Sequence, residues 1–207
     1  MARLLANDNP LDNYGDNSQK FKVLTTVASF YLAKATKETD EKMRKELFTD
    51  VIRYLTKSEK IKLTDKSTFA LKGFLFFFQN DSKLSATYFD NAKEVGPNFM
   101  PCVLGRACLE FAKKKYSEAR DLFKAALKQN PQGPIQMRVG LSICYFQLDE
   151  LDLAKIGFQS VLAREPKCVE AIIGLAVIAK RQGQLQAYYS RLEEIHRLEP
   201  SNYLLCA

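Results

Sequence analysis

The sequence predicts an all-α protein built as a solenoid of repeated helix-turn-helix hairpins. Long runs of Ala, Leu, Lys, Glu and Gln, with few β-branched clusters, favour helix along most of the 207 residues. Four prolines (Pro97, Pro131, Pro166 and Pro200) follow one another at intervals of 34, 35 and 34 residues. Each proline ends one helical stretch shortly before the next begins. A period of this length accommodates one pair of helices.

Residue size follows the same period. The spacing resembles that of the tetratricopeptide (TPR) repeat, in which the proline is position 32. The resemblance implies small residues at positions 8 and 20, where the two helices of a hairpin cross closely. Position 24 then carries a bulky residue and position 27 a further apolar one. Position 8 holds Gly73, Ala107, Ser142 and Ala176. Position 20 holds Ser85, Ala119 and Ala154, but Tyr188 in the last repeat. Position 24 holds Phe89, Phe123, Phe158 and Leu192, and position 27 holds Ala92, Ala126, Val161 and Ile195. This pattern resembles that of the TPR repeat, which implies a superhelical solenoid.

The register divides the chain into segments. Residues 1–18 are expected to be an irregular arm, because Asp, Asn and Gly dominate residues 7–17. Residues 19–200 then form a TPR array of about five hairpins, over 19–62, 66–97, 100–131, 135–166 and 169–200. The first hairpin is placed by Val27, Ala28 and Tyr31, which match positions 7, 8 and 11. Residues 201–207 begin a further, truncated repeat. Because a terminal repeat needs a polar capping helix, we expect the chain to be part of a longer protein.

Composition argues against several classes of protein. No segment approaches the roughly 20 apolar residues of a membrane span. The five cysteines have no CxxC spacing and are interpreted as buried, reduced thiols. A single histidine, His196, excludes a conventional zinc site. Without a phosphate-binding loop or a nucleophile motif, no catalytic residue, metal or cofactor is expected, and the protein is predicted not to be an enzyme.

In a TPR array, which this pattern resembles, the first helix of each hairpin lines a concave groove chiefly through positions 2, 5, 9 and 12, with position 13 near the rim. In the four regular repeats, positions 5, 9, 12 and 13 are mostly apolar, which argues against capture of a peptide's terminal carboxylate by Lys, Asn and Arg. An apolar segment of another protein is the expected occupant. The predicted partner-binding groove consists of Phe74, Phe77, Phe78, Leu104, Cys108, Phe111, Val139, Ile143, Phe146, Ile173 and Val177.

The stretch KGFLFFFQN (72–80) has more aromatics than one helix face holds. The register assigns Leu75 and Phe76 to packing between helices, and Phe74, Phe77 and Phe78 to the groove or its rim. Two explanations remain open. Tight curvature of the solenoid, or the N-terminal arm folding back, buries the rings within the chain. Alternatively, a partner covers them, because so large an apolar patch exceeds what a monomer usually exposes.

Two longer strings point to a particular family. LGRACLEFAKKKYSEARDLFKAALKQNPQGP (104–134) and VGLSICYFQLDELDLAKIGFQSVLAREPKCVEAIIGLAVIA (139–179) closely resemble the TPR scaffold subunit of the polymerase-associated factor (Paf) transcription elongation complex. The resemblance extends from VASFYLAKATKE (27–38) to EPSN (199–202). It implies a nuclear, non-enzymatic scaffold that assembles the Paf complex on RNA polymerase II and supports co-transcriptional histone modification. In that family the N-terminal TPR region binds a segment of the complex's namesake subunit.

Other functions compete with this interpretation. The chain also fits a TPR adaptor of another multisubunit assembly. Its net charge of +7 permits weak contact with nucleic acid, or with an acidic protein partner. No small-molecule substrate and no membrane are expected.

Overall fold

The computed structural model describes residues 16–198, which form ten α-helices and no strand. The all-α fold predicted from the sequence is therefore confirmed. The arm expected over residues 1–18 and the truncated repeat expected over 201–207 lie outside the described residues, except that residues 17 and 18 already belong to the first helix. No helix in residues 16–198 is long and apolar enough to cross a membrane.

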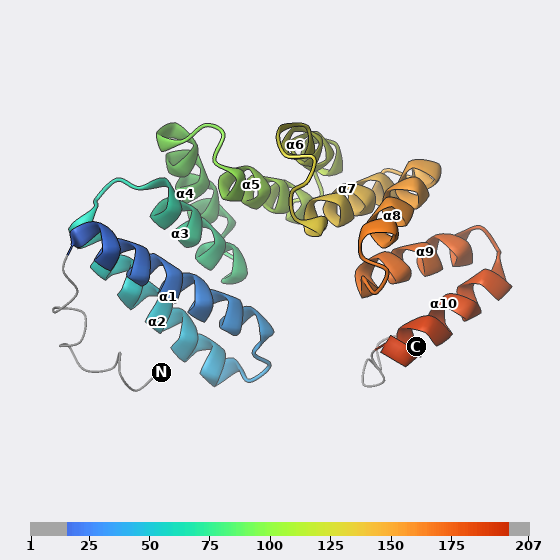
Figure 1. Cartoon of the computed structure of the whole chain (residues 1–207), viewed down its shortest axis with the longest axis horizontal. Helices are drawn as coiled ribbons and strands as arrows, with labels where there is room; N and C mark the ends of the chain where they lie inside the picture. Colours follow the sequence, from blue (N-terminus) through green and yellow to red (C-terminus); the bar gives the residue numbers. More distant parts are fainter. Residues whose placement is uncertain (1–15, 199–207) are drawn as a thin grey trace. The chain divides into compact units, whose positions relative to one another are not determined.

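The chain divides into two compact units, and the boundary between Gly105 and Arg106 falls within α5 (Met100–Ala112). In the first unit the helices pack as two hairpins, α1 with α2 and α3 with α4, and the first pair lies side by side in Figure 1. Their bounds are α1 (Asn17–Lys37), α2 (Glu41–Ile61), α3 (Lys66–Phe78) and α4 (Ser82–Val95).

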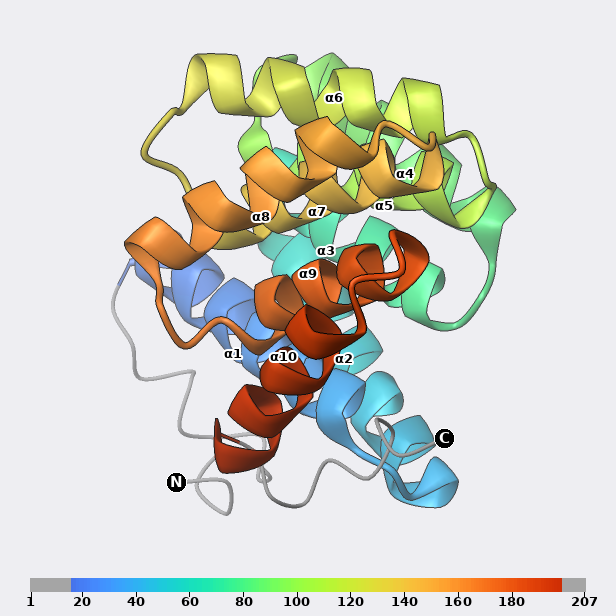
Figure 2. The ribbon, with the colours of Figure 1, turned by 90° about the vertical axis from the view of Figure 1, so that its right-hand side faces the viewer.

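The second unit holds the end of α5 and five further helices. Helix α6 packs on α7, α7 on α8, α8 on α9, and α9 on α10, and Figure 2 shows α7 and α8 side by side. Their bounds are α6 (Tyr116–Gln129), α7 (Ile135–Gln147), α8 (Leu151–Arg164), α9 (Val169–Arg181) and α10 (Leu185–Leu198).

Helices α1 to α4 start at aspartates. In each of α1 to α4 an Asp side chain accepts a hydrogen bond from a backbone N–H of the first turn, which satisfies a donor that the helix itself leaves unpaired. The four caps are Asp16, Asp40, Asp65 and Asp81. Helices α6 to α9 have no such side-chain cap. The 34-residue pattern did not predict these caps.

Four hairpin turns share one backbone geometry. Asn80, Lys114, Asp149 and Gly183 have φ between +62° and +72° and follow one another at the same 34, 35 and 34-residue intervals as the prolines. In each turn the N–H of this residue donates to the carbonyl three residues back, and the next N–H donates to the carbonyl five back. This is the Schellman arrangement that ends helices. The period is therefore fixed by turn geometry as well as by proline.

Each unit has its own apolar core. In the first unit, Leu24, Ala28 and Leu32 of α1 pack with residues of α2 around Tyr54, and Leu75 joins them from α3. In the second unit, Val139 of α7 packs with Ala154 and Phe158 of α8 and with residues of α9. The small residues at position 20 are fully buried where the helices cross, as at Ala119 and Ala154.

Replacing Lys114 with Gly should raise the free energy of unfolding by about 1 kcal/mol, because a left-handed backbone is strained for lysine and unstrained for glycine. Urea denaturation of the two proteins measures the difference. The matched control is Lys113→Gly. Lys113 is not among the positive-φ residues, and its ammonium pairs with Glu110, so glycine there should loosen the chain, remove this ion pair and lower stability. Equal effects at the two positions would contradict the assignment of strain to Lys114.

Candidate functional site

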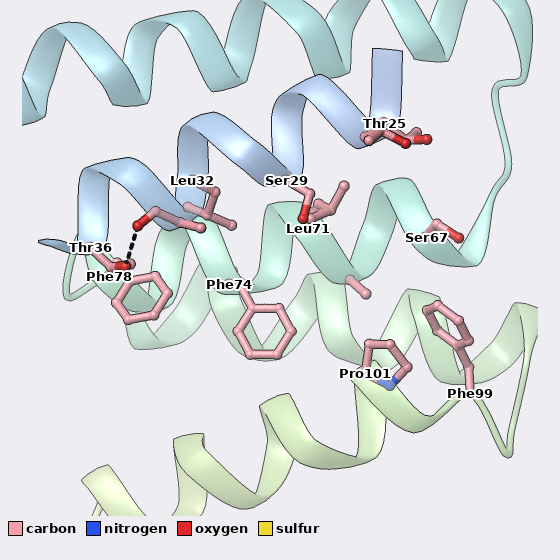
Figure 3. Close-up of a pocket in the computed structure, with 13 residues that line it drawn as sticks. Thr25, Ser29, Leu32, Thr36, Ser67, Leu71, Phe74, Phe78, Phe99 and Pro101 are labelled. Carbon is pink, nitrogen blue, oxygen red and sulfur yellow. Dashed lines mark hydrogen bonds between the residues drawn. The ribbon is translucent and has the colours of Figure 1, made fainter. Parts of the chain in front are cut away.

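A hollow of about 590 Å³ lies between α1, α3 and the start of α5 in the first unit. We call it the α1–α3 hollow. Figure 3 shows hydroxyl side chains on its α1 wall, Phe74 and Phe78 on its α3 wall, and Phe99 and Pro101 beside α3. The residues that line it are Thr25, Thr26, Ser29, Leu32, Ala33, Thr36, Ser67, Ala70, Leu71, Phe74, Phe78, Phe99 and Pro101.

The chemistry of the α1–α3 hollow is that of a binding surface. None of its lining side chains is an acid, a base or a thiol. Within residues 16–198 there is also no cluster of three or more His, Cys, Asp or Glu that could hold a metal ion. Aromatic and aliphatic side chains on one wall face hydroxyl groups on the other, so the hollow can take up apolar groups and hydrogen-bond a polar backbone.

Helix α3, which carries the aromatic wall, is fixed from two sides. Toward α2, Lys72 Nζ pairs with Glu59 Oε1 at 2.6 Å, and both side chains are largely buried. Toward α4, Ser85 Oγ donates to the carbonyl of Gly73 at 2.9 Å. Because a buried hydrogen bond without a substitute partner is costly to break, these contacts hold α3 in place beneath the hollow.

One end of the α1–α3 hollow is held by a buried aspartate. Burial opposes ionisation of Asp65, but the Lys62 ammonium and the backbone N–H groups of Ser67 and Thr68 outweigh burial and keep its pKa below the ordinary value. Lys62 Nζ lies 2.7 Å from Asp65 Oδ1. Since Ser67 lines the hollow, this aspartate anchors the start of α3 at the site.

The aromatics of α3 divide among three environments. Phe74 lines the α1–α3 hollow with its ring edge-on to Phe89, the ring centroids 5.1 Å apart. Phe78 lines it as well and stays 42% exposed. Phe77 is not among the lining residues, and its ring packs edge-on against Phe78. Leu75 is buried, and half-buried Phe76 stacks on Tyr88 of α4 at 5.3 Å. Packing within the chain therefore accounts for some of the aromatic side chains that exceed one face of α3.

The other predicted groove residues do not line the α1–α3 hollow. Leu104, Cys108 and Phe111 are half-buried along α5, and the Phe111 ring contacts Tyr116. Val139 is a buried core residue, which removes most of its side chain from any groove. Half-buried Ile143 and Phe146 pack beside that core. Ile173 is half-buried and Val177 is exposed on α9.

The α1 wall was not among the predicted groove residues, although the sequence of α1 contains a signal for it. When Val27, Ala28 and Tyr31 are placed at positions 7, 8 and 11, positions 5, 9, 12 and 13 of the same helix are Thr25, Ser29, Leu32 and Ala33. All four line the α1–α3 hollow. The predicted groove residues come only from the four regular repeats, which do not include the first hairpin.

The described cysteines are free, and each has an environment that suppresses reactivity. Burial, with a smaller contribution from Cys108, raises the pKa of Cys144 to about 12. Burial also raises the pKa of Cys102, Cys108 and Cys168. Because the thiolate is the nucleophile and the metal ligand, these thiols are inert near neutral pH.

The fold is that of a TPR protein. A tetratricopeptide repeat protein of Parabacteroides merdae superposes with a TM-score of 0.64, at 16% identity, over 90% of this chain and 70% of that chain. PilF of Pseudomonas aeruginosa superposes with a TM-score of 0.76, at 13% identity, over 91% of this chain and 81% of that chain. At these identities the likeness concerns the fold alone.

Curated relatives identify a more particular likeness. The chain is 29% identical to the protein CTR9 homolog of Arabidopsis thaliana over 160 residues, 77% of this chain. It is 22% identical to the RNA polymerase-associated protein CTR9 of Caenorhabditis elegans over 173 residues, 81% of this chain. Tetratricopeptide repeat protein 1 of Schizosaccharomyces pombe is 26% identical over 80% of this chain and 17% of its own length. No protein-family model matches the chain.

The chain matches about 15% of the length of the two CTR9 relatives. The resemblance to the TPR scaffold subunit of the Paf complex, indicated by the sequence, is confirmed by these two relatives.

Phe74→Ala should lower the free energy of unfolding more than Phe78→Ala. Phe74 packs on Phe89 and beside the core of the first unit, whereas Phe78 is 42% exposed. We expect a loss of about 2 kcal/mol for Phe74 and of less than about 1 kcal/mol for Phe78. Urea denaturation of the single variants tests this order. Losses of the same size would mean that Phe78 also belongs to the core.

Cys144 should resist alkylation in the folded chain. With a pKa of about 12, only about one thiol in a thousand is ionised at pH 9, whereas an unfolded thiol is mostly ionised there. We therefore expect iodoacetamide to modify Cys144 about a thousandfold more slowly in buffer than in 8 M urea, measured by peptide mass spectrometry.

The same shift predicts how stability changes with pH. The pKa of Cys144 is higher in the native protein than in the unfolded chain. Burial of the neutral thiol therefore contributes fully to the free energy of unfolding below about pH 8.5, and this contribution is lost as pH rises toward 12. Rapid alkylation of Cys144 by iodoacetamide in the folded chain at pH 9 would contradict the burial of this thiol.

Proposed function

We propose that this chain is a non-enzymatic protein-interaction scaffold, and that it contributes the partner-binding face of a Paf-complex TPR subunit. The observation that carries the proposal is the α1–α3 hollow. Phe74 and Phe78 line it beside hydroxyl groups, and no titratable side chain lines it. Such a surface can hold a segment of another protein but supplies no acid, base or metal ligand for catalysis.

The CTR9 relatives support the more specific part of the proposal. The C. elegans relative is named as RNA polymerase-associated, and the match covers most of the present chain. We infer a nuclear role in transcription elongation on RNA polymerase II, with support of co-transcriptional histone modification. The namesake subunit of the Paf complex is the proposed direct partner.

The remaining groove residues extend this proposal beyond the α1–α3 hollow. Exposed Val177, and the half-buried Ile143, Phe146 and Ile173, offer apolar surface in the second unit for the same partner or for another subunit. Val139 contributes through its core packing, which supports its neighbours on α7.

Co-expression with the namesake subunit tests the partner. The wild-type chain should co-elute with that subunit in size-exclusion chromatography, and Phe78→Ser should abolish co-elution, because it places a hydroxyl where an apolar group is buried on binding. Phe30→Ser is the matched control. Phe30 is 64% exposed on α1 and is absent from the lining of the α1–α3 hollow, so this variant should bind like the wild type.

Failure of the wild-type chain to co-elute, with capture of subunits of a different assembly, would instead favour a TPR adaptor of that assembly. Binding to RNA or DNA that weakens steeply with salt would favour nucleic-acid association.

A further inference from the structure

The α1–α3 hollow shares lining residues with a smaller hollow at each end. At one end, Thr25 and Ser67 also line a hollow of about 480 Å³ with Asn17, Ser18, Phe21, Lys22, Ile61 and Lys62. At the other end, Phe78 also lines a hollow of about 420 Å³ with Arg44, Lys45, Phe48, Thr49, Ile52, Gln79 and Asn80. We call the three hollows together the trough. All of it lies within the first unit.

The trough is uncharged in the middle and cationic at both ends. Lys22 and Lys62 line one end, Arg44 and Lys45 line the other, and no carboxylate lines any of the three hollows. Lys62 is held by buried Asp65 and exposed Lys45 by Glu41, at 2.7 and 2.8 Å.

Two of the four cations keep their charge available. Exposed Lys22 and Arg44 form no ion pair within residues 16–198. The pKa of Glu41 is lowered mainly by Lys45, and the positive charge of Arg44 makes a smaller contribution. Each end of the trough therefore offers one positive charge to an incoming group.

The α1 wall favours an extended occupant. An extended segment leaves its backbone N–H and C=O groups unpaired, whereas a helix satisfies its own. The Thr25 and Thr36 hydroxyls donate to carbonyls of their own helix, at 3.0 and 2.9 Å, so their oxygens remain able to accept hydrogen bonds. In Figure 3 these hydroxyls lie along one side of the α1–α3 hollow, opposite the Phe74 ring.

We propose that the trough binds an extended segment of a partner protein in which an apolar centre is flanked on each side by an acidic residue. Helix α3 has 13 residues and is about 20 Å long. An extended chain covers this length in about six residues, which sets the spacing of the two acids. This inference rests on the proposed function, because it takes the same face as the partner site and specifies the chemistry of the partner.

Two peptide sets test the inference by fluorescence anisotropy with the full chain. The first set tiles the namesake subunit in overlapping 15-residue peptides. The second set consists of designed peptides with a five-residue centre of Leu, Ile, Phe, Ala and Thr, flanked by Glu, Gln or Lys at both ends. We expect the Glu-flanked peptides to bind about tenfold more tightly than the Gln-flanked ones, and the Lys-flanked ones not to bind measurably.

Charge reversal locates the contact. Lys22→Glu and Arg44→Glu should each weaken binding of the Glu-flanked peptides about tenfold and reduce its sensitivity to salt. Lys83→Glu is the matched control, since Lys83 is exposed on α4 and lines none of the three hollows. All three side chains are exposed, so circular dichroism and thermal melting should show unchanged folding.

The outcomes separate this inference from the proposed function. One of the 15-residue peptides of the namesake subunit could bind in a way that depends on Phe78, while neither charge reversal weakens its binding. The proposed function then stands, and the requirement for flanking acidic residues is wrong. If no tile binds while the designed peptides prefer Glu and depend on Lys22 and Arg44, the inference stands and the partner is a different protein. Equal binding of Glu- and Gln-flanked peptides overturns the inference. A single-stranded oligonucleotide that competes through the same two cations also overturns it, in favour of nucleic acid.

Discussion

The ring of Phe89 is the contact on which the candidate site depends. It is fully buried on α4, and glycines face it from α3 and from α5. A Cβ at Gly73 would lie 2.5 Å from the ring, and one at Gly105 would also overlap it. Because neither helix has a side chain at this point, both approach the ring closely, and Phe74 then packs edge-on against it. The aromatic wall of the trough is thus supported from beneath by α4.

The same contact links later hairpins, as Phe123 faces Gly140 and Phe158 faces Gly174. The sequence predicted the bulky position 24, because it recurs with the proline spacing. It did not predict the glycine at position 6 of the following repeat, since the need for a small residue arises from a ring in the preceding hairpin. Period and residue size therefore predict that the hairpins exist. Contacts between successive hairpins depend on geometry that spacing does not contain.

The site could be predicted in part for a similar reason. Phe74 and Phe78 were assigned to the groove from the register, and both line the α1–α3 hollow. The opposite wall was missed, because α1 and α2 have 21 residues each, so the first hairpin does not follow the 34-residue period from which the groove positions were taken. Val139 was expected in the groove, but its neighbours Ala154 and Phe158 enclose it in the core of the second unit. A position number gives the direction of a side chain, whereas packing decides how much of it remains accessible.

The middle of the trough takes its walls from α1, α3 and the start of α5, and α2 contributes to both ends. In a repeat protein each hairpin is stabilised by its own packing and by its immediate neighbours, so unfolding can begin at one end and spread. A segment lying in the trough would contact α1, α2 and α3 at once and tie the first hairpin to the second. Binding would then make the first two hairpins unfold together and raise the free energy of unfolding of the first unit.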